Sequence, residues 1–177
     1  MIDALKKSLW KQFGAAIDML NNAIMLCPDD YWNTNRKLFY QSYHCLLFLD
    51  YYLSIPPRGF SSPLPFMITT PGEIPTDAID DLVPERMYSK IELLNYLQLS
   101  RAKCRTLIAG LTEEKIIERW TKEADAIAGS STLNYSVLDI LLYNMKHVQH
   151  HAAQLNLLLR QGINNAAGWI PQADDEL

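Results

Sequence analysis

The segment 134–162 constrains the fold more than any other part of this chain, because its pattern predicts one long amphipathic helix. Apolar residues recur in it every three or four positions, and this spacing places their side chains on one face of a helix. A stripe of this length needs a core to cover it. Its members are Leu138, Leu141, Met145, Val148, Ala152, Leu155 and Leu159.

Three histidines, His147, His150 and His151, lie in the middle of this predicted helix. At about 100° per residue, His151 lies beside the centre of the apolar stripe, His147 lies at its edge, and His150 points toward solvent. Two imidazoles four residues apart are neighbours on a helix surface and can bind one divalent metal ion. The same pair also fits histidines that are hydrogen-bonded at the edge of a core, so both interpretations are open.

A third ligand for such an ion has one candidate among the histidines, because His44 is the only other histidine in the chain. It lies in the predicted helix 34–53, which is polar at its start and then apolar on nearly all sides. A helix of that kind is buried by several neighbours, so His44 is expected in the interior. Three neutral imidazoles leave at least one coordination position open, as in catalytic zinc sites.

Other residues near these histidines have simpler interpretations. Gln154 shares a face with the paired histidines, so it either orients an imidazole or a metal-bound water from the outer shell, or is a polar surface residue. Cys45 is turned about 100° away from His44 and is predicted as a small core residue. Asp50 is predicted to make a packing or cap contact. The aromatic residues expected in the core or in a pocket wall are Tyr40, Phe48 and Tyr51.

The remaining helices are predicted from periodicity and capping patterns. Residues 3–26 carry an apolar stripe that ends at a proline, and residues 89–109 begin with the capping-box pattern of Ser89 and Glu92. A short connection favours antiparallel neighbours, so the helix 34–53 is expected to run back beside the first helix.

The segment 54–88 carries most of the nine prolines. Neither a helix nor a central strand tolerates that density, so the segment predicts a long irregular crossover with one short turn at 77–82. Connections of this length are usually functional. A crossover that traverses the molecule places the helix 89–109 parallel to the helix 34–53.

Beyond the third long helix, a short extra helix is predicted at 112–123, followed by a loop at 129–132 that leads into the histidine helix. The tail 163–177 is predicted to be irregular, with Trp169 and Ile170 packed back on the helices and an acidic end in solvent.

Composition limits the class of protein. A chain of 177 residues, about half of them apolar, predicts a single domain over residues 1–177. The net charge of −4 with interspersed signs disfavours nucleic acid and anionic membranes as partners. The absence of a signal peptide or transmembrane pattern predicts a cytoplasmic protein. Three irregularly spaced cysteines fit neither a disulfide framework nor a structural zinc motif, so buried reduced thiols are expected.

The run His147-Val-Gln-His-His151-Ala-Ala-Gln154, together with the lone His44 in an aromatic and aliphatic helix, resembles the DinB/YfiT-like metalloenzyme family. The resemblance covers the whole chain in element order and length. It implies an all-α fold, a four-helix bundle with up-down-down-up order, in which the proline-rich crossover joins helices 2 and 3 and the short extra helix joins helices 3 and 4. It also implies a divalent metal ion bound by His44, His147 and His151.

The chain departs from the family pattern at two places. Ala152-Ala153 stands where members often have Arg-Gly, and Tyr143 stands where a further histidine is frequent. These departures leave the three histidines intact and bear on which subfamily's substrate applies.

The resemblance implies an enzyme, either a thiol S-transferase or a hydrolase, with an open metal position for water or a thiol. The expected metal is zinc, with nickel or iron as alternatives, and the expected partners are a small-molecule substrate such as a low-molecular-weight thiol and a second copy in a homodimer. A zinc peptidase of the HExxH kind is disfavoured because Val148, not a glutamate, follows the first histidine of the pair. The alternatives are a non-catalytic bundle that binds a metal or a small molecule, and a metal-free scaffold.

Overall fold

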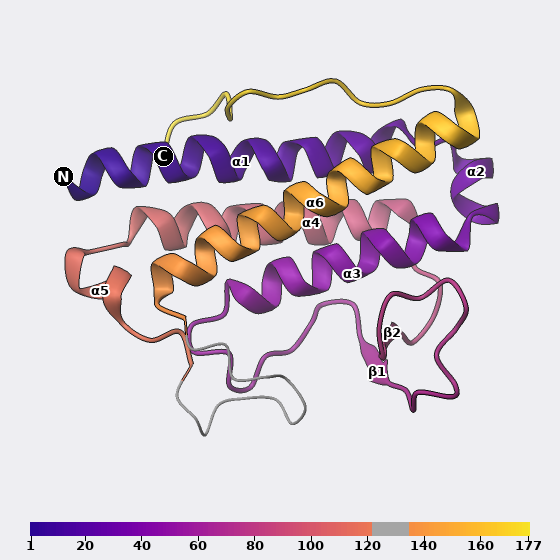
Figure 1. The fold of residues 1–177 in the computed structure, drawn as a ribbon, viewed down its shortest axis with the longest axis horizontal. Helices are drawn as coiled ribbons and strands as arrows, with labels where there is room; N and C mark the ends of the chain where they lie inside the picture. Colours follow the sequence, from indigo (N-terminus) through magenta and orange to yellow (C-terminus); the bar gives the residue numbers. More distant parts are fainter. Residues whose placement is uncertain (122–134) are drawn as a thin grey trace.

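The computed structural model describes residues 1–121 and 135–177, and helices account for 61% of the chain. Four long helices pack side by side (Figure 1) and enclose one large hydrophobic core. The all-α prediction is therefore confirmed. The long helices are α1 (Ile2–Leu26), α3 (Arg36–Tyr52), α4 (Lys90–Ala109) and α6 (Val137–Ile163).

The connection between α1 and α3 differs from the prediction. It contains a short helix, α2 (Asp29–Thr34), whose Trp32 is buried against Phe39 of α3. Both α1 and α3 pack mainly on α4 and α6. The expectation that α3 lies beside α1 is wrong, because the turn of helix in α2 carries the chain to the other side of the core.

Capping determines where the later helices begin. The Ser89 side chain accepts a hydrogen bond from the Glu92 backbone N–H, and the Glu92 carboxylate accepts one from the Ser89 N–H, as the capping-box pattern predicted. Ser136 and Asp139 make the same reciprocal pair at the start of α6. Both helices therefore begin with two of their free backbone N–H groups satisfied.

The short extra helix is shorter than predicted. Helix α5 (Glu113–Ile117) ends where Glu118 takes an extended conformation, and the next residues lead to a bridge between Arg119 and Ser136. The predicted end of this helix at residues 122–123 and the predicted loop at 129–132 lie outside the described residues.

The crossover between α3 and α4 contains two strands that the sequence did not predict. Strand β1 (Phe66–Ile68) pairs antiparallel with β2 (Leu82–Pro84), with Met67 opposite Val83. Each strand has only three residues, which is too short to show an alternating pattern. Strand β2 packs on α3, and Val83 is buried there. The predicted turn at 77–82 is the approach to β2.

The tail also differs from the prediction. Trp169 is 72% exposed, so the expectation that it packs back on the helices is wrong, whereas Ile170 is partly buried against the core. The acidic end does not lie free in solvent. It runs along α1 (Figure 1), where the Ala173 N–H donates to the Lys11 carbonyl and Asp175 pairs with Arg101 of α4.

Two further predictions concern the core and the surface. Cys27, Cys45 and Cys104 are all free and buried, as expected. Burial raises the pKa of the Cys45 and Cys104 thiols, so both are protonated at neutral pH. Within the described residues, no helix combines the length and the hydropathy that a membrane crossing requires.

Candidate metal centre

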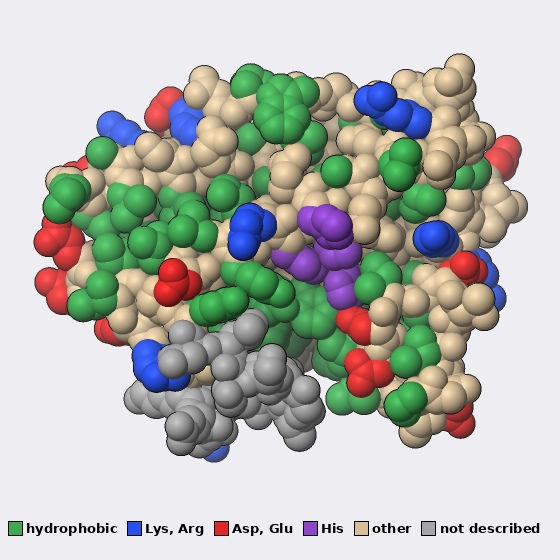
Figure 2. All heavy atoms as spheres, in the orientation of Figure 1, with side chains coloured by type: hydrophobic (Ala, Val, Ile, Leu, Met, Phe, Trp, Pro, Cys, Tyr) green, Lys and Arg blue, Asp and Glu red, His purple; other side chains and the backbone are tan. Residues whose placement is uncertain are grey.

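The fold brings together the three histidines that the sequence singled out. His44 comes from α3, and His147 and His151 come from successive turns of α6, which packs directly on α3. One ring nitrogen from each histidine lies within 4.8 Å of those of the other two. Figure 2 shows the histidine side chains together on one face of the molecule, beside hydrophobic and acidic side chains.

The distances fit a shared ion. His147 Nε2 lies 3.2 Å from His44 Nε2. Two nitrogens that each bind zinc at 2.0–2.1 Å in a tetrahedron are about 3.3 Å apart. The pair therefore has the separation of two ligands of one ion, and one ring nitrogen of His151 lies within 4.8 Å of both.

The electrostatic environment keeps the α6 imidazoles neutral. Burial, followed by the neighbouring imidazoles, lowers the pKa of His147 to about 3. Burial and the neighbouring histidines lower the pKa of His151 to about 4, against an opposing hydrogen bond to Gln154. Both rings are deprotonated at pH 7. The neutral imidazole is the form that binds a metal ion, because only it has a free nitrogen lone pair.

Two glutamines hold the His151 ring. The Nδ1 atom of His151 lies 2.9 Å from Gln154 Oε1 and 2.6 Å from Gln41 Nε2, and Gln41 also donates a hydrogen bond to Gln154. Gln154 Oε1 accepts from Nδ1 when that atom carries the proton, and this tautomer leaves Nε2 free to bind a metal, whereas the Gln41 amide N–H can donate only to an unprotonated Nδ1. The contact of Gln154 with a predicted ligand is as the sequence suggested. Gln41 was missed, although it lies three residues before His44 on the same helix.

Asp80 is the second residue that the sequence did not single out. Its Oδ2 atom lies 2.8 Å from His44 Nδ1, on the side of the ring away from His147. The oxygen lies off the direction of a hydrogen bond from Nδ1, so this buried nitrogen has a close ion-pair neighbour without an aligned hydrogen bond. Asp80 comes from the crossover, where no periodic pattern pointed to it.

Aromatic rings cover one side of the histidine cluster. Phe48 packs against His44 and His147, and Tyr52 meets His147 edge to face. The Nδ1 atom of His147 is buried without a hydrogen-bond partner in the described part of the chain. Tyr40 and Tyr51 are buried, in agreement with the predicted core or wall.

The other residues that the sequence analysis considered near the histidines do not belong to the three-histidine cluster. His150 is exposed, as predicted. Cys45 is fully buried in the core. Asp50 is buried in an ion pair with Lys103 and accepts a hydrogen bond from Tyr96, so its role is in packing. These positions agree with the simpler interpretations.

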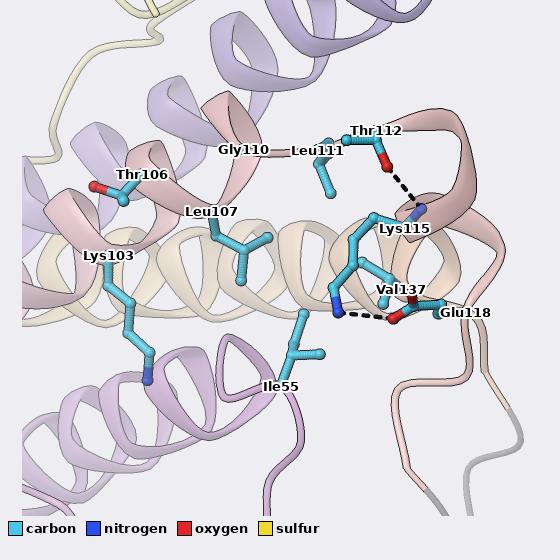
Figure 3. A pocket seen from close by; sticks show the side chains of 10 residues that line it. All are labelled: Ile55, Lys103, Thr106, Leu107, Gly110, Leu111, Thr112, Lys115, Glu118 and Val137. Atoms are coloured by element: carbon cyan, nitrogen blue, oxygen red, sulfur yellow. Dashed lines mark hydrogen bonds and ion pairs between the residues drawn. The ribbon is translucent and has the colours of Figure 1, made fainter.

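A cavity of about 590 Å³ lies away from the histidines, between the C-terminal end of α4, α5 and the start of α6 (Figure 3). Val137 lines it, and His147 lies ten positions further along α6, a rise of about 15 Å. Its charged groups are already engaged, because Lys103 pairs with Asp50 and Lys115 with Glu118. The cavity is therefore not part of the histidine site.

Comparisons of this chain with protein-family models, with curated proteins and with solved structures found no match. The interpretation of the site therefore depends on its geometry and chemistry. Those establish three clustered imidazoles that can hold a metal ion.

Proposed function

We propose that this chain binds a divalent metal ion through His44, His147 and His151. The observation that carries the proposal is the convergence of three imidazoles from two helices. Zinc is the proposed ion, because it accepts nitrogen ligands and forms catalytic sites with three protein ligands and one open position. Nickel and iron accept the same donor set.

The proposal extends to the DinB/YfiT-like family and its four-helix bundle with up-down-down-up order. The HxxxHxxQ run in α6 and the lone His44 in α3 support the family. The course of α1, α3, α4 and α6 in Figure 1 supports the order. The long crossover supports it too, because a connection that traverses the molecule allows two successive helices to run in the same direction.

The proposed activity is that of a metal-dependent thiol S-transferase or hydrolase. When bound, zinc supplies the Lewis acidity that makes a water molecule or a thiol nucleophilic at neutral pH. The chain itself supplies neutral imidazoles, a fixed ring at His151, and the rings of Phe48 and Tyr52, which exclude water from one side. The His44 side chain is 13% exposed, so the cluster is reachable from solvent.

A second candidate is a metal site without catalysis. The observation that favours it is that the ligands bridge α3 and α6, which pack directly on each other. An ion there ties together residues 103 positions apart in the chain and stabilises only the folded state.

Metal analysis of the purified protein tests the ligand assignment. We expect about one equivalent of metal in the wild type and a loss of most of it in His147→Ala. His150→Ala is the matched control, because it removes an exposed histidine from the same helix. Full metal content in His147→Ala would show that the assignment is wrong.

Activity assays then separate the two candidates. Removal of metal by a chelator lowers the melting temperature under both. Only the enzyme proposal predicts turnover of thiol or ester substrates that disappears with the metal and returns when zinc is added. A metal-loaded protein without such turnover supports the second candidate.

A further inference from the structure

The Nδ1 atom of His44 needs an acceptor if the ring is to bind a metal ion. His44 Nε2 faces His147 Nε2, so Nε2 is the nitrogen that points into the cluster. A ring that binds through Nε2 carries its proton on Nδ1. That atom is buried, and a buried donor without an acceptor costs stability and leaves the ring free to turn.

The crossover presents one carboxylate at this position. Asp80 Oδ2 lies 2.8 Å from His44 Nδ1, and within the described residues it is the one carboxylate that makes an ion-pair contact with a histidine. Its side chain is 27% exposed, so it can adjust its direction.

The antiparallel pair of β1 and β2, called the β-ribbon below, holds Asp80 in place. The other carboxylate oxygen, Oδ1, accepts a hydrogen bond of 3.1 Å from the Leu82 N–H. Leu82 begins β2, and the buried Val83 keeps β2 against α3, the helix that carries His44. The two oxygens therefore have separate partners, one in the ribbon and one in the metal site.

We propose that Asp80 is a positioning residue, which fixes the His44 ring and its tautomer and so raises the affinity of the site for zinc. The inference rests on the proposed metal site. It assigns a task to the crossover between α3 and α4, which is to bring a carboxylate to a ligand that the helices alone leave without a partner.

Asp80→Asn separates this role from a purely structural one. Asparagine has one acceptor oxygen where aspartate has two, so it cannot serve both Leu82 and His44. Loss of the bond to Leu82 affects the ribbon and appears as a lower melting temperature in chelator. Loss of the contact with His44 affects the metal site and appears as weaker zinc binding.

The control is Asp81→Asn, which removes the same charge from the adjacent residue. Asp81 is exposed, and it contacts the ribbon through its backbone carbonyl, which accepts a hydrogen bond from the Thr69 N–H. The substitution keeps that carbonyl. An effect of the lower net charge as such therefore appears in both variants, whereas loss of the contact with His44 appears only in Asp80→Asn.

Zinc affinity is measured by competition with a chromophoric chelator, together with melting temperature in excess chelator. We expect the zinc Kd to rise about 10–100-fold in Asp80→Asn, and to change less than about threefold in Asp81→Asn. Equal affinities for the two variants would overturn the proposal, and so would a lower melting temperature in chelator with unchanged zinc affinity. A wild type that binds no zinc would overturn the metal site itself and this inference with it.

Discussion

Replacing Gly14 by alanine is predicted to destabilise this protein, although the same change stabilises most helix interiors. Alanine in a helix is favoured over glycine by about 0.5–1 kcal/mol. At position 14, however, an added Cβ would lie 2.7 Å from Cβ of Ala173 in the tail. That atom is bonded to the tail backbone, so the backbone itself must shift. Overpacking of this kind costs about 1–3 kcal/mol, which leaves a net loss of about 0.5–2 kcal/mol.

A second substitution removes the collision. Ala173→Gly deletes a fully buried methyl group and raises the conformational entropy of the unfolded chain. Alone it is therefore expected to lower the free energy of unfolding by about 1–2 kcal/mol. Together with Gly14→Ala it moves the methyl group from the tail to α1, in the same space. The double variant is therefore expected to be nearly as stable as the wild type, with a coupling energy of about 1.5–4 kcal/mol between the two positions, the sum of the two single losses.

Urea unfolding followed by far-UV circular dichroism measures all four proteins, provided that the denaturant slope is unchanged. Gly110→Ala is the control, because a Cβ there meets only ordinary contacts at 3.5 Å and beyond. It is expected to change the free energy of unfolding by less than about 0.5 kcal/mol. The reasoning is refuted if Gly14→Ala is more stable than the wild type, or if the losses of the two single variants simply add.

Three other predictions concern the metal, pH and a buried charge. At zinc concentrations about 100 times the Kd, the free energy of unfolding of the wild type is expected to be about 2.7 kcal/mol higher than in chelator, which raises the melting temperature by about 5–10 °C. In a thermal scan, His151→Ala is expected to show no such difference between zinc and chelator. Hydrogen bonds from Arg86 and Ser89 lower the pKa of Glu92 to about 2. The stability that Glu92 contributes is thus present at pH 7 and is lost as the pH falls from about 4.5 through about 2. Thermal scans between pH 7 and pH 2 should show Glu92→Gln less stable than wild type at pH 7, with most of that difference gone at pH 2. Lys103→Met leaves the buried Asp50 without its cation and is expected to lower the free energy of unfolding by about 1–3 kcal/mol in urea.

The long helices and the three clustered histidines could be predicted from the sequence because both depend on local regularity. A stripe of apolar residues fixes which face of α6 is buried, and that face determines where His147 and His151 point. His44 followed from the burial of its own helix. The three histidines come together because the buried faces of α3 and α6 pack against each other.

The connections could not be predicted to the same degree, because their positions depend on contacts between distant residues. Asp80 reaches His44 only because a three-residue strand packs on α3, and three residues are too few to show a period. Gln41 carried a usable signal, since residues three apart on a helix are neighbours and Gln41 lies three before His44.

The tail shows a limit of reasoning from hydropathy. Trp169 was expected to be buried because it is large and apolar, yet it is exposed, whereas the small Ala173 is fully buried. The burial of Ala173 depends on Gly14, whose missing side chain lets the tail approach α1 closely. Arg101 then pairs with both Asp18 and Asp175. The contact of Ala173 with α1 and the ion pair of Asp175 with Arg101 do not follow from any sequence pattern within the tail.

The position of Asp80 on a ribbon outside the helices has a consequence for how such a protein can change during evolution. The imidazoles belong to helices whose other faces form the core, so substitutions on those other faces disturb the whole structure. The ribbon contacts the helices through a few residues of β2, and its first strand is largely exposed. Substitutions there can alter the environment of the histidines while the scaffold stays intact, which makes the crossover the part of the chain where new specificity can arise at least cost to folding.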